Sequence, residues 1–344
     1  MVEIKGNKSF CRIIVDRKDV VKNMIIKKRG SPIELYKLDA LHRRIPLHHQ
    51  MKEKVFFDFK KARTGIRGEK EIDFSLKFLD HQNYLILQHL RLSDQNGAFQ
   101  IDHLILTRKY ILILEVKNWY GTVIFGESGQ VIRIGDNGIE EGFPNPIPQA
   151  KLQQHRLQKW LNSAGLSNIP INFFVVISFP SAIIKSASAE FPIPDQVIHN
   201  NQLLFEIPKL DKMYQNPILE SIDLMELGQQ LNAAHTPSTQ NLLVKYGIEP
   251  RELMKGIFCP NCNTVPMLRR KQKWFCRTCQ YTSSEAHFSA LNDYQWLIRD
   301  YITNRDARDF LRIESPDVVR RILNNAGFTH IGDNKGRIYR LEIR

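Results

Sequence analysis

Long apolar segments and cysteines are both scarce in this sequence, and each shortage excludes a class of protein. No apolar run approaches the ~20 residues that a membrane-spanning helix needs. The N-terminal residues carry charges at Glu3, Lys5 and Lys8 instead of the apolar stretch of a secretory signal. The chain has 5 cysteines in 344 residues, an odd number that does not suit a disulfide framework. We therefore expect a cytoplasmic protein that does not bind a membrane.

Acidic residues are outnumbered at both ends of the chain. Residues 1–64 hold 17 Lys and Arg against 7 Asp and Glu, and residues 251–344 hold 17 against 10. Residues 65–250 hold 15 against 19, so the formal charge of +13 divides into +10, −4 and +7. Basic flanks fit contact with the phosphates of a nucleic acid, but they also keep a protein soluble. Charge alone leaves both functions open.

The chain is long enough for two or three domains, and 42% of its residues are hydrophobic, enough for a substantial core. Charge, cysteine spacing and apolar periodicity divide it into five expected segments. These are a basic helical arm at 1–64, an α/β core at 65–180, a helical connector at 181–255, a paired-cysteine module at 256–285 and a terminal module at 290–344.

The expected core mixes helical and strand-like patterns. A helix should begin after Gly68, because Ile72, Leu76 and Leu79 share one helical face. The segments expected after it are strands at 84–90, 100–107 and 110–117, a hairpin within 121–142, a helix at 146–162 and a strand at 171–179. Runs that are apolar on both faces predict a sheet covered on both sides.

Asp102 and Glu115 stand inside two neighbouring strand-like runs that a short linker joins. If these runs form a tight antiparallel hairpin centred between Arg108 and Lys109, the numbers of paired residues sum to 217. Asp102 then lies opposite Glu115, and Lys117 follows on the same face. A shift of one residue in the register would separate the three groups.

Two carboxylates at this spacing can hold Mg²⁺ or Mn²⁺, which prefer oxygen ligands. Such a metal acidifies a bound water and offsets charge at a phosphorus centre, and Lys117 can stabilise that charge. The alternative is that Asp102 and Glu115 end their strands at the solvent, with Lys117 as an ion-pair partner. Burying an acid among apolar residues without a cation is costly, which favours the metal site.

The motifs around these residues resemble the NERD domain (nuclease-related domain), a branch of the PD-(D/E)XK nuclease superfamily. They are Gly65-x-x-Gly68-Glu69, Gln100-Ile101-Asp102-His103, Glu115-Val116-Lys117-Asn118-Trp119 followed by Gly121, and Asn145-Pro146-x-x-Gln149. The resemblance covers about 65–180. It implies a mixed sheet flanked by helices and metal-dependent cleavage of phosphodiester bonds.

The resemblance also implies roles for single residues. Asp102, Glu115 and the carbonyl of Val116 are similar to the family's metal ligands, and Lys117 is similar to its catalytic lysine. The implied cofactor is Mg²⁺ or Mn²⁺.

Two further residues match family positions less specifically. Glu69 matches the acid of the family's first helix, although a favourable charge near a helix N-terminus explains it equally well. Gln149 matches the family's helical glutamine, which could orient water or a phosphate, and a plain surface glutamine explains it as well.

Four of the five cysteines form the pairs Cys259–Cys262 and Cys276–Cys279, with 13 residues between the pairs. Each Cys-x-x-Cys can form a tight turn that presents two thiolates, and two such turns complete a tetrahedral Zn²⁺ site. We therefore expect a zinc ribbon with a structural ion. The remaining Cys11 is expected to be an inert thiol.

Basic and aromatic residues between the two cysteine pairs suit phosphate contact and base stacking. The expected nucleic-acid-binding residues of this hairpin are Arg269, Arg270, Lys271, Lys273 and Trp274. Trp274 could equally belong to the small core of the ribbon.

The last segment has the pattern of a winged helix-turn-helix, with helices expected at 292–302, 305–312 and 316–325 and a hairpin after them. Ser315 is an expected N-cap with Pro316 at the first helical position. The second helix of such a module enters the major groove and the wing follows the backbone. The residues expected to contact nucleic acid are Arg320, Arg321, Lys335 and Arg337. A three-helix adaptor with a hairpin fits almost as well.

The sequence therefore predicts a divalent-metal-dependent nuclease that acts on DNA in preference to RNA, with basic flanks that bind the substrate. Two alternatives stay open. The protein could be catalytically inactive and bind nucleic acid on a nuclease scaffold, or it could process RNA.

Overall fold

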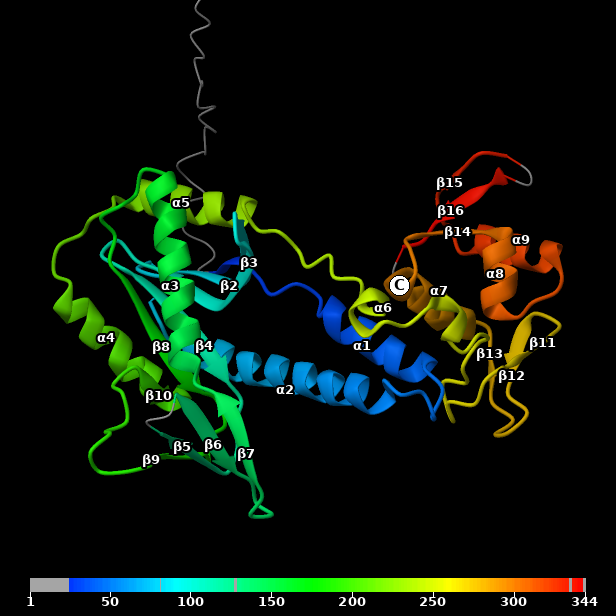
Figure 1. The fold of residues 1–344 in the computed structure, drawn as a ribbon. Coiled ribbons are helices and arrows are strands. Elements are labelled where there is room, and N and C mark those ends of the chain that lie inside the picture. The colour runs from blue at the N-terminus through cyan, green and yellow to red at the C-terminus, as the bar shows by residue number, and fades with distance from the viewer. Residues whose placement is uncertain (1–24, 81, 127–128, 334–335, 343–344) are drawn as a thin grey trace, which may run out of the picture. The chain divides into compact units, whose positions relative to one another are not determined.

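The computed structural model describes residues 25–80, 82–126, 129–333 and 336–342, so the predicted inert thiol Cys11 lies outside the described residues. Contacts divide the chain into two units (Figure 1). The sheet unit contains the described residues up to Arg29 together with Arg67–Pro237. The cysteine unit contains Gly30–Ile66 and the described residues from Ser238 on. The expected arm at 1–64 thus contributes to both units.

The sheet unit is built on a six-stranded mixed sheet with the order β1-β2-β3-β4-β8-β10. Its strands are β1 (Ile25–Lys27), β2 (Leu85–Asp94), β3 (Gly97–Leu106), β4 (Ile111–Lys117), β8 (Ile171–Ile177) and β10 (Val197–His199). The pairs β2–β3 and β3–β4 are antiparallel, whereas the pairs β1–β2, β4–β8 and β8–β10 are parallel. The predicted α/β core is confirmed.

Helices cover both faces of this sheet, because its strands are apolar on both sides. α3 (Pro146–Ser163) and α5 (Ser221–Ala233) pack with Ile111 and Ile113 of β4 in one core cluster (Figure 1). α4 (Leu203–Met213), which follows the 3₁₀ turn η1 (Asn200–Gln202), packs with the C-terminal part of α2 and with Leu112 and Leu114 in the cluster of the other face.

A second sheet of four strands has the order β7-β6-β5-β9. Its strands are β5 (Thr122–Phe125), β6 (Gln130–Ile134), β7 (Glu140–Pro144) and β9 (Ile183–Ser186). The hairpin predicted within 121–142 corresponds to β5–β6–β7.

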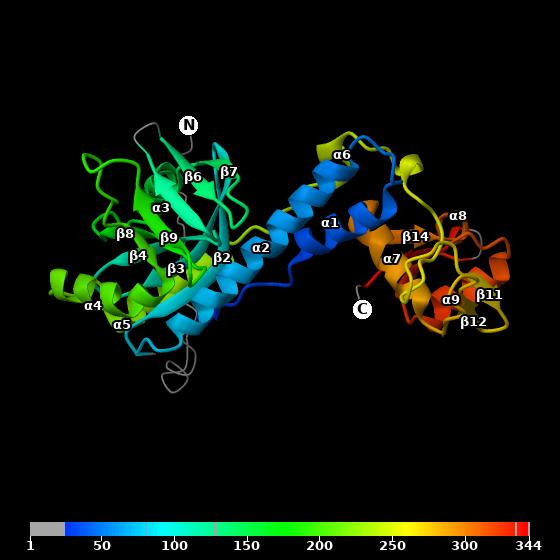
Figure 2. The ribbon, with the colours of Figure 1, turned by 90° about the horizontal axis from the view of Figure 1, so that it is seen from below.

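The helix predicted to begin after Gly68 begins earlier. α2 runs from Lys52 to Leu76 and passes through Gly65 and Gly68 without a break, as Figure 2 shows. Glycine weakens a helix by only about 1 kcal/mol, and the residues before Gly65 are good helix formers. The two glycines therefore do not mark the start of the helix.

The cysteine unit contains α1 (Ile33–Arg44), the N-terminal part of α2, α6 (Leu242–Tyr246) and the 3₁₀ turn η2 (Pro250–Glu252). The cysteine loops carry the sheet β11 (Leu268–Arg270), β12 (Lys273–Phe275) and β13 (Thr282–Ser283). Its C-terminal part contains α7 (Ala286–Leu297), β14 (Tyr301–Thr303), α8 (Asn304–Leu311), α9 (Pro316–Asn325), β15 (His330–Ile331) and β16 (Ile338–Arg340).

One core cluster joins the cysteine loops to the C-terminal helices. Cys259 and Trp274 lie in it together with Ala290, Phe310 and Ile322 from α7, α8 and α9. The expected modules at 256–285 and 290–344 therefore share one core.

The helix predicted at 292–302 is wrong at both ends. α7 is shifted to Ala286–Leu297, and Tyr301–Thr303 forms β14, which pairs with β16. The predicted N-cap is confirmed, because the Ser315 side chain accepts a hydrogen bond from the Val318 N–H. Both the winged-helix and the adaptor interpretation predicted three helices and a hairpin, whereas the structure has three helices and the three-stranded sheet β14-β16-β15.

None of the helices among the described residues has the length and apolar character needed to cross a membrane.

Candidate functional site

Asp102 lies where the main sheet breaks its regular pattern. The β2–β3 ladder skips His89 and Asp102, which stand opposite each other, and His89 has a left-handed φ of 52°. Leu87 and Leu90 on either side of the skipped residue belong to the same core cluster, so the alternation of side chains shifts by one residue. The Asp102 carboxylate instead accepts a hydrogen bond from the backbone N–H of Val116 (2.9 Å).

The predicted register of the hairpin is correct, but its ladder stops short of the acids. From His103 opposite Leu114 onward, the paired residues of β3 and β4 have numbers that sum to the predicted 217. No pair of Asp102 with Glu115 continues this ladder. The two strands are connected at this point by the hydrogen bond from Val116 to the Asp102 carboxylate.

Glu115 is buried, with 2% of its surface exposed, and both its oxygens are held. Oε1 accepts a hydrogen bond from the Lys117 ammonium (2.6 Å), and Oε2 accepts one from the Gln153 amide (2.7 Å). Lys117 also donates to Gln149 Oε1 (3.1 Å), and Gln153 to the Gln100 carbonyl (2.9 Å). Gln149 and Gln153 are one turn apart on α3, so this helix fixes both Glu115 and Lys117.

Glu69 reaches the site because α2 approaches the sheet closely at Gly68. A Cβ on Gly68 would lie 2.5 Å from Asn118 Cβ and 2.7 Å from Ser178 Oγ. Asn118 and Ser178 directly follow β4 and β8, so only a glycine allows this approach. Glu69 is thereby buried next to the ends of these strands.

The His103 side chain contacts Asp73 and Arg29, although the residue adjoins Asp102 in the sequence. Its Nε2 lies 2.8 Å from Asp73 Oδ1 and 3.2 Å from Arg29 Nη2, and the ring is fully buried. Arg29 in turn pairs with Glu69 (2.8 Å). His103 is therefore part of the support behind Glu69.

The carboxylates affect one another's ionisation. Burial, followed by the charges of Glu115 and Glu69, raises the pKa of Asp102 well above its usual value. Burial also acts to raise the pKa of Glu69, but the hydrogen bond with His89 and the charge of Arg29 bring it below its usual value. The negative charge around Asp102 is thus not fully offset by the side chains that surround it.

The donor set fits a divalent cation that prefers oxygen. Asp102 and Glu115 supply carboxylate oxygens. Burial, and after it the charges of Glu115 and Glu69, raises the pKa of Asp102, and a cation would offset both effects. Glu69, Asp102 and Glu115 do not all lie within 4.8 Å of one another, and the charge of Glu115 acts more strongly on Asp102 than that of Glu69 does. The Val116 N–H is the group that contacts Asp102, and the role of its carbonyl as a ligand stays a prediction.

The structure thus brings together the predicted residues Glu69, Asp102, Glu115, Lys117 and Gln149. Two residues that bind the carboxylates of the site, Arg29 and Gln153, were not predicted from the sequence. The spacing of Gln153, one turn after Gln149, was the available signal for it. Arg29 gave no such signal, because it sits in a basic run.

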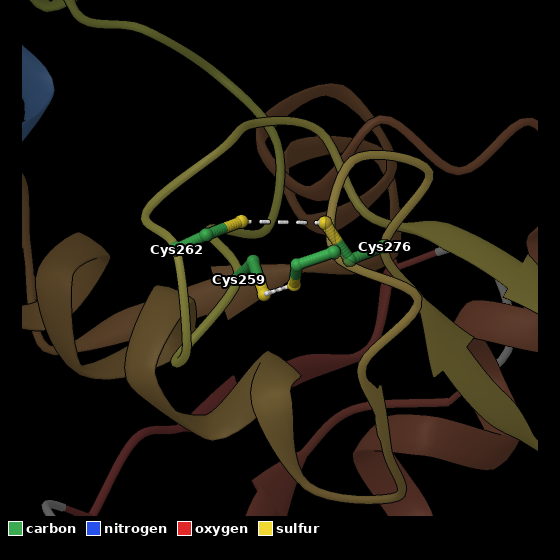
Figure 3. A group of neighbouring side chains, drawn as sticks. Cys259, Cys262 and Cys276 are labelled. Carbon is green, nitrogen blue, oxygen red and sulfur yellow. Dashed lines mark hydrogen bonds between the residues drawn. The ribbon is translucent and has the colours of Figure 1, made fainter.

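The four cysteines of the expected zinc ribbon converge. Their sulfur atoms all lie within 4.8 Å of one another, and among the described residues they are the one group of three or more potential metal ligands this close. Each short sulfur–sulfur distance is between a cysteine of the first Cys-x-x-Cys pair and a cysteine of the second. Cys259 Sγ lies 3.6 Å from Cys279 Sγ, and Cys262 Sγ lies 3.5 Å from Cys276 Sγ (Figure 3).

The two cysteine loops repeat one backbone geometry. The N–H of Asn263 donates to the Cys259 carbonyl, and the N–H of Gln280 donates to the Cys276 carbonyl. Asn263 and Gln280 have left-handed φ values of 57° and 61°. Hydrogen bonds with Thr264 lower the pKa of Cys262 to about 6, which favours the thiolate that binds zinc. Four sulfur ligands in this arrangement fit a closed, structural Zn²⁺ site.

The predicted nucleic-acid-binding residues of the ribbon fall into two groups. Trp274 is 1% exposed and donates to His287 Nδ1 (3.1 Å), so it belongs to the core and offers no face to a base. Arg269 lies over the Trp274 ring (4.7 Å). Arg270, Lys271 and Lys273 are exposed.

Of the predicted residues of the terminal module that the structure describes, two are exposed and Arg337 is half-buried. Arg320 is exposed and pairs with Asp317 (2.9 Å), and Arg321 is exposed. Arg337 lies 3.7 Å from Asp333. Lys335 lies outside the described residues.

Comparison with known proteins gives one match. Residues 64–178 match the family model of NERD, the nuclease-related domain. No curated protein and no solved structure matches the chain. The matched range contains Glu69, Asp102, Glu115, Lys117 and Gln149. The sheet unit therefore carries a nuclease-related domain of the NERD family.

Proposed function

We propose that the NERD domain of this protein is a divalent-metal-dependent nuclease, with DNA as the preferred substrate. The observation that carries the proposal is the cluster of Asp102 and Glu115 with Lys117 at the end of β4, inside a nuclease-related domain. The alternative of strand-ending acids at the solvent is disfavoured, because Glu115 is buried and held by two donors.

Asp102, Glu115 and the Val116 carbonyl would hold the cation. When bound, Mg²⁺ or Mn²⁺ supplies charge neutralisation at the phosphate and acidifies water. The protein contributes orientation, because Val116 fixes Asp102 and Gln153 fixes Glu115.

Lys117 is the cationic group of the site. Its ammonium, 21% exposed at the side chain, lies between Glu115 and Gln149. This ammonium would stabilise the negative charge that develops on the phosphate. Gln149 is exposed and accepts a hydrogen bond from the Lys117 ammonium, so it can orient that ammonium or the substrate.

The cysteine unit would hold a structural Zn²⁺ through Cys259, Cys262, Cys276 and Cys279. Its exposed basic side chains are the proposed contacts to the nucleic-acid backbone, whose binding should weaken with added salt. The exposed ones are Arg270, Lys271, Lys273, Arg320 and Arg321. The half-buried Arg269 and Arg337 are proposed with them, as is Lys335, which lies outside the described residues.

The test is cleavage of plasmid, linear duplex and single-stranded DNA, and of RNA of matched length, with Mg²⁺ or Mn²⁺ and with the metal removed. Asp102→Ala, Glu115→Ala and Lys117→Ala should each lower the rate by about 10²- to 10³-fold. Glu226→Gln, a change of an exposed acid on α5, is the matched control and should cleave like the wild type.

Cleavage that persists in all three alanine variants would refute the assignment of the site. Salt-sensitive binding of DNA with neither cleavage nor Mn²⁺ binding would favour the inactive scaffold instead. Faster cleavage of RNA than of DNA would identify the protein as an RNA-processing enzyme.

A further inference from the structure

The chain segment that ends at Arg29 lies outside the 64–178 range of the family match, yet it is built into the site. β1 extends the main sheet beside β2. Lys27 is buried, and its ammonium donates to the carbonyls of Gln88 (2.9 Å) and His89 (3.1 Å). These carbonyls flank the point where β2 leaves the ladder opposite Asp102. The segment therefore supports the irregularity at which Asp102 leaves the β2–β3 pairing.

Arg29 connects this segment to two acids on α2. Its Nε donates to Glu69 Oε2 (2.8 Å), and its Nη1 and Nη2 donate to Asp73 (2.8 and 3.3 Å). Its backbone N–H donates to Gln88 Oε1 (3.0 Å), and its side chain is 10% exposed. Glu69 and Asp73 are one helical turn apart, so the planar guanidinium spans both carboxylates.

Glu69 is held at a single oxygen by this arrangement. Arg29 Nε and His89 Nδ1 both approach Oε2, at 2.8 and 3.6 Å. This carboxylate is near Asp102, because His89, whose Nδ1 approaches Glu69 Oε2, stands opposite Asp102 in the β2–β3 register. Without Arg29, a buried carboxylate would lose its main counter-charge and its fixed orientation.

We propose that Arg29 is a positioning residue of the nuclease site, which fixes the Glu69 carboxylate beside the Asp102–Glu115 pair. This inference rests on the proposed function. Arg29 acts through Glu69, and the functional nuclease domain then begins at least at β1, upstream of the matched range.

The test is a double-mutant cycle on kcat in the full-length, zinc-loaded chain. Arg29→Gln should lower kcat by about 10- to 100-fold, as loss of an outer-shell partner does, with KM for DNA little changed. Glu69→Gln should lower kcat at least as much. The double variant should be no slower than Glu69→Gln alone, because Arg29 then has no carboxylate to position.

Glu71→Gln, a change of an exposed acid on the same helix as Glu69, is the matched control and should keep kcat near the wild-type value. Arg29→Lys, which keeps the charge and lacks the fork, takes the place of Arg29→Gln if the latter does not fold.

The outcomes separate this inference from the proposed function. Effects of Arg29→Gln and Glu69→Gln that multiply in the double variant, or a kcat loss in Glu71→Gln equal to that in Arg29→Gln, would overturn the positioning role alone. A wild-type chain that neither cleaves nor binds Mn²⁺ would overturn the proposed function, and the positioning role with it.

Discussion

At the scale of single residues, the two carboxylates of the site are held by one ammonium and by neutral donors. Glu115 receives one hydrogen bond from an ammonium and one from an amide, and Asp102 receives one from a backbone N–H. The amide and the backbone N–H keep their carboxylates in one orientation without cancelling the charge, whereas the Lys117 ammonium offsets part of the charge of Glu115. A bound cation would favour the charged form of Asp102, which burial and the neighbouring acids disfavour.

Gln153→Leu should destabilise the protein by about 1–3 kcal/mol, because it removes a donor from a buried carboxylate. Urea unfolding monitored by circular dichroism measures the change. Gln158→Leu is the control, since Gln158 bonds Asn162 on the surface of the same helix. Equal losses in the two variants would show that the Gln153–Glu115 hydrogen bond contributes nothing specific.

Asp73 should make stability depend on pH in the acid range. Burial acts to raise the pKa of Asp73, but hydrogen bonds from His103 and Arg29 bring it below its usual value. A lowered folded-state pKa gives stability that is complete above the unfolded pKa of about 3.9 and is lost as the pH falls through the folded value.

Asp73→Asn should therefore be less stable than the wild type at pH 7, and the two should converge as the pH falls through the folded pKa of Asp73. Urea unfolding across this pH range provides the measurement. Glu71→Gln, an exposed change on the same helix, should track the wild type throughout. A constant difference between Asp73→Asn and the wild type at every pH would contradict the account.

At the scale of elements, apolar runs and register were predictable, and local irregularities were not. The strands predicted at 84–90, 100–107 and 110–117 correspond to β2, β3 and β4. They were predictable because a short, continuous apolar run is typical of a strand that is buried on both faces. The register followed from the short linker between β3 and β4. The skipped pair His89 and Asp102 depends on a left-handed residue on another strand, which no periodicity reveals.

The origin of Glu69's position also lay beyond the sequence pattern. Gly65 and Gly68 look alike in the sequence, yet only Gly68 lies against neighbouring atoms. Similarly, Arg29 is one of three basic residues in Lys27-Lys28-Arg29, and only the pairing of β1 with β2 shows that it is buried. Tertiary contacts decide both cases.

Gly68→Ala should destabilise the sheet unit by about 1–3 kcal/mol, because the new Cβ overlaps Asn118 and Ser178. It should also slow cleavage, because α2 carries Glu69 away from the strands. Gly65→Ala is the matched control: nothing lies within 4 Å of its added Cβ, so it should stabilise the helix by about 0.5–1 kcal/mol. A neutral effect of Gly68→Ala on both stability and cleavage would contradict this account.

At the scale of the whole molecule, the chain combines a nuclease-related domain with a cysteine unit, and each has its own core. The cysteine spacing was sufficient to predict that the four cysteines cluster, because two Cys-x-x-Cys turns commonly supply the four ligands of one tetrahedral zinc site. The shared core of the cysteine loops and α7–α9 was not predictable, because it depends on packing between distant segments.

Removal of zinc should unfold more than the two cysteine loops. Cys259 and Cys276 are buried in the cluster that also holds α7, α8 and α9, so loss of the ion exposes apolar surface of all three helices. Metal analysis should give one zinc per chain, and chelation or Cys276→Ser should abolish the cooperative unfolding transition of this unit in calorimetry. A zinc-free protein with an unchanged transition would show that the four cysteines are not a structural metal site.

The central claim is that Asp102 and Glu115 together bind a divalent cation. Calorimetric titration of Mn²⁺ into the zinc-loaded chain tests it directly, independently of any substrate. The account predicts saturable binding by the wild type and by Glu226→Gln, and loss of that binding in both Asp102→Asn and Glu115→Gln. Absence of binding in the wild type, or unchanged binding in the two site variants, would contradict it.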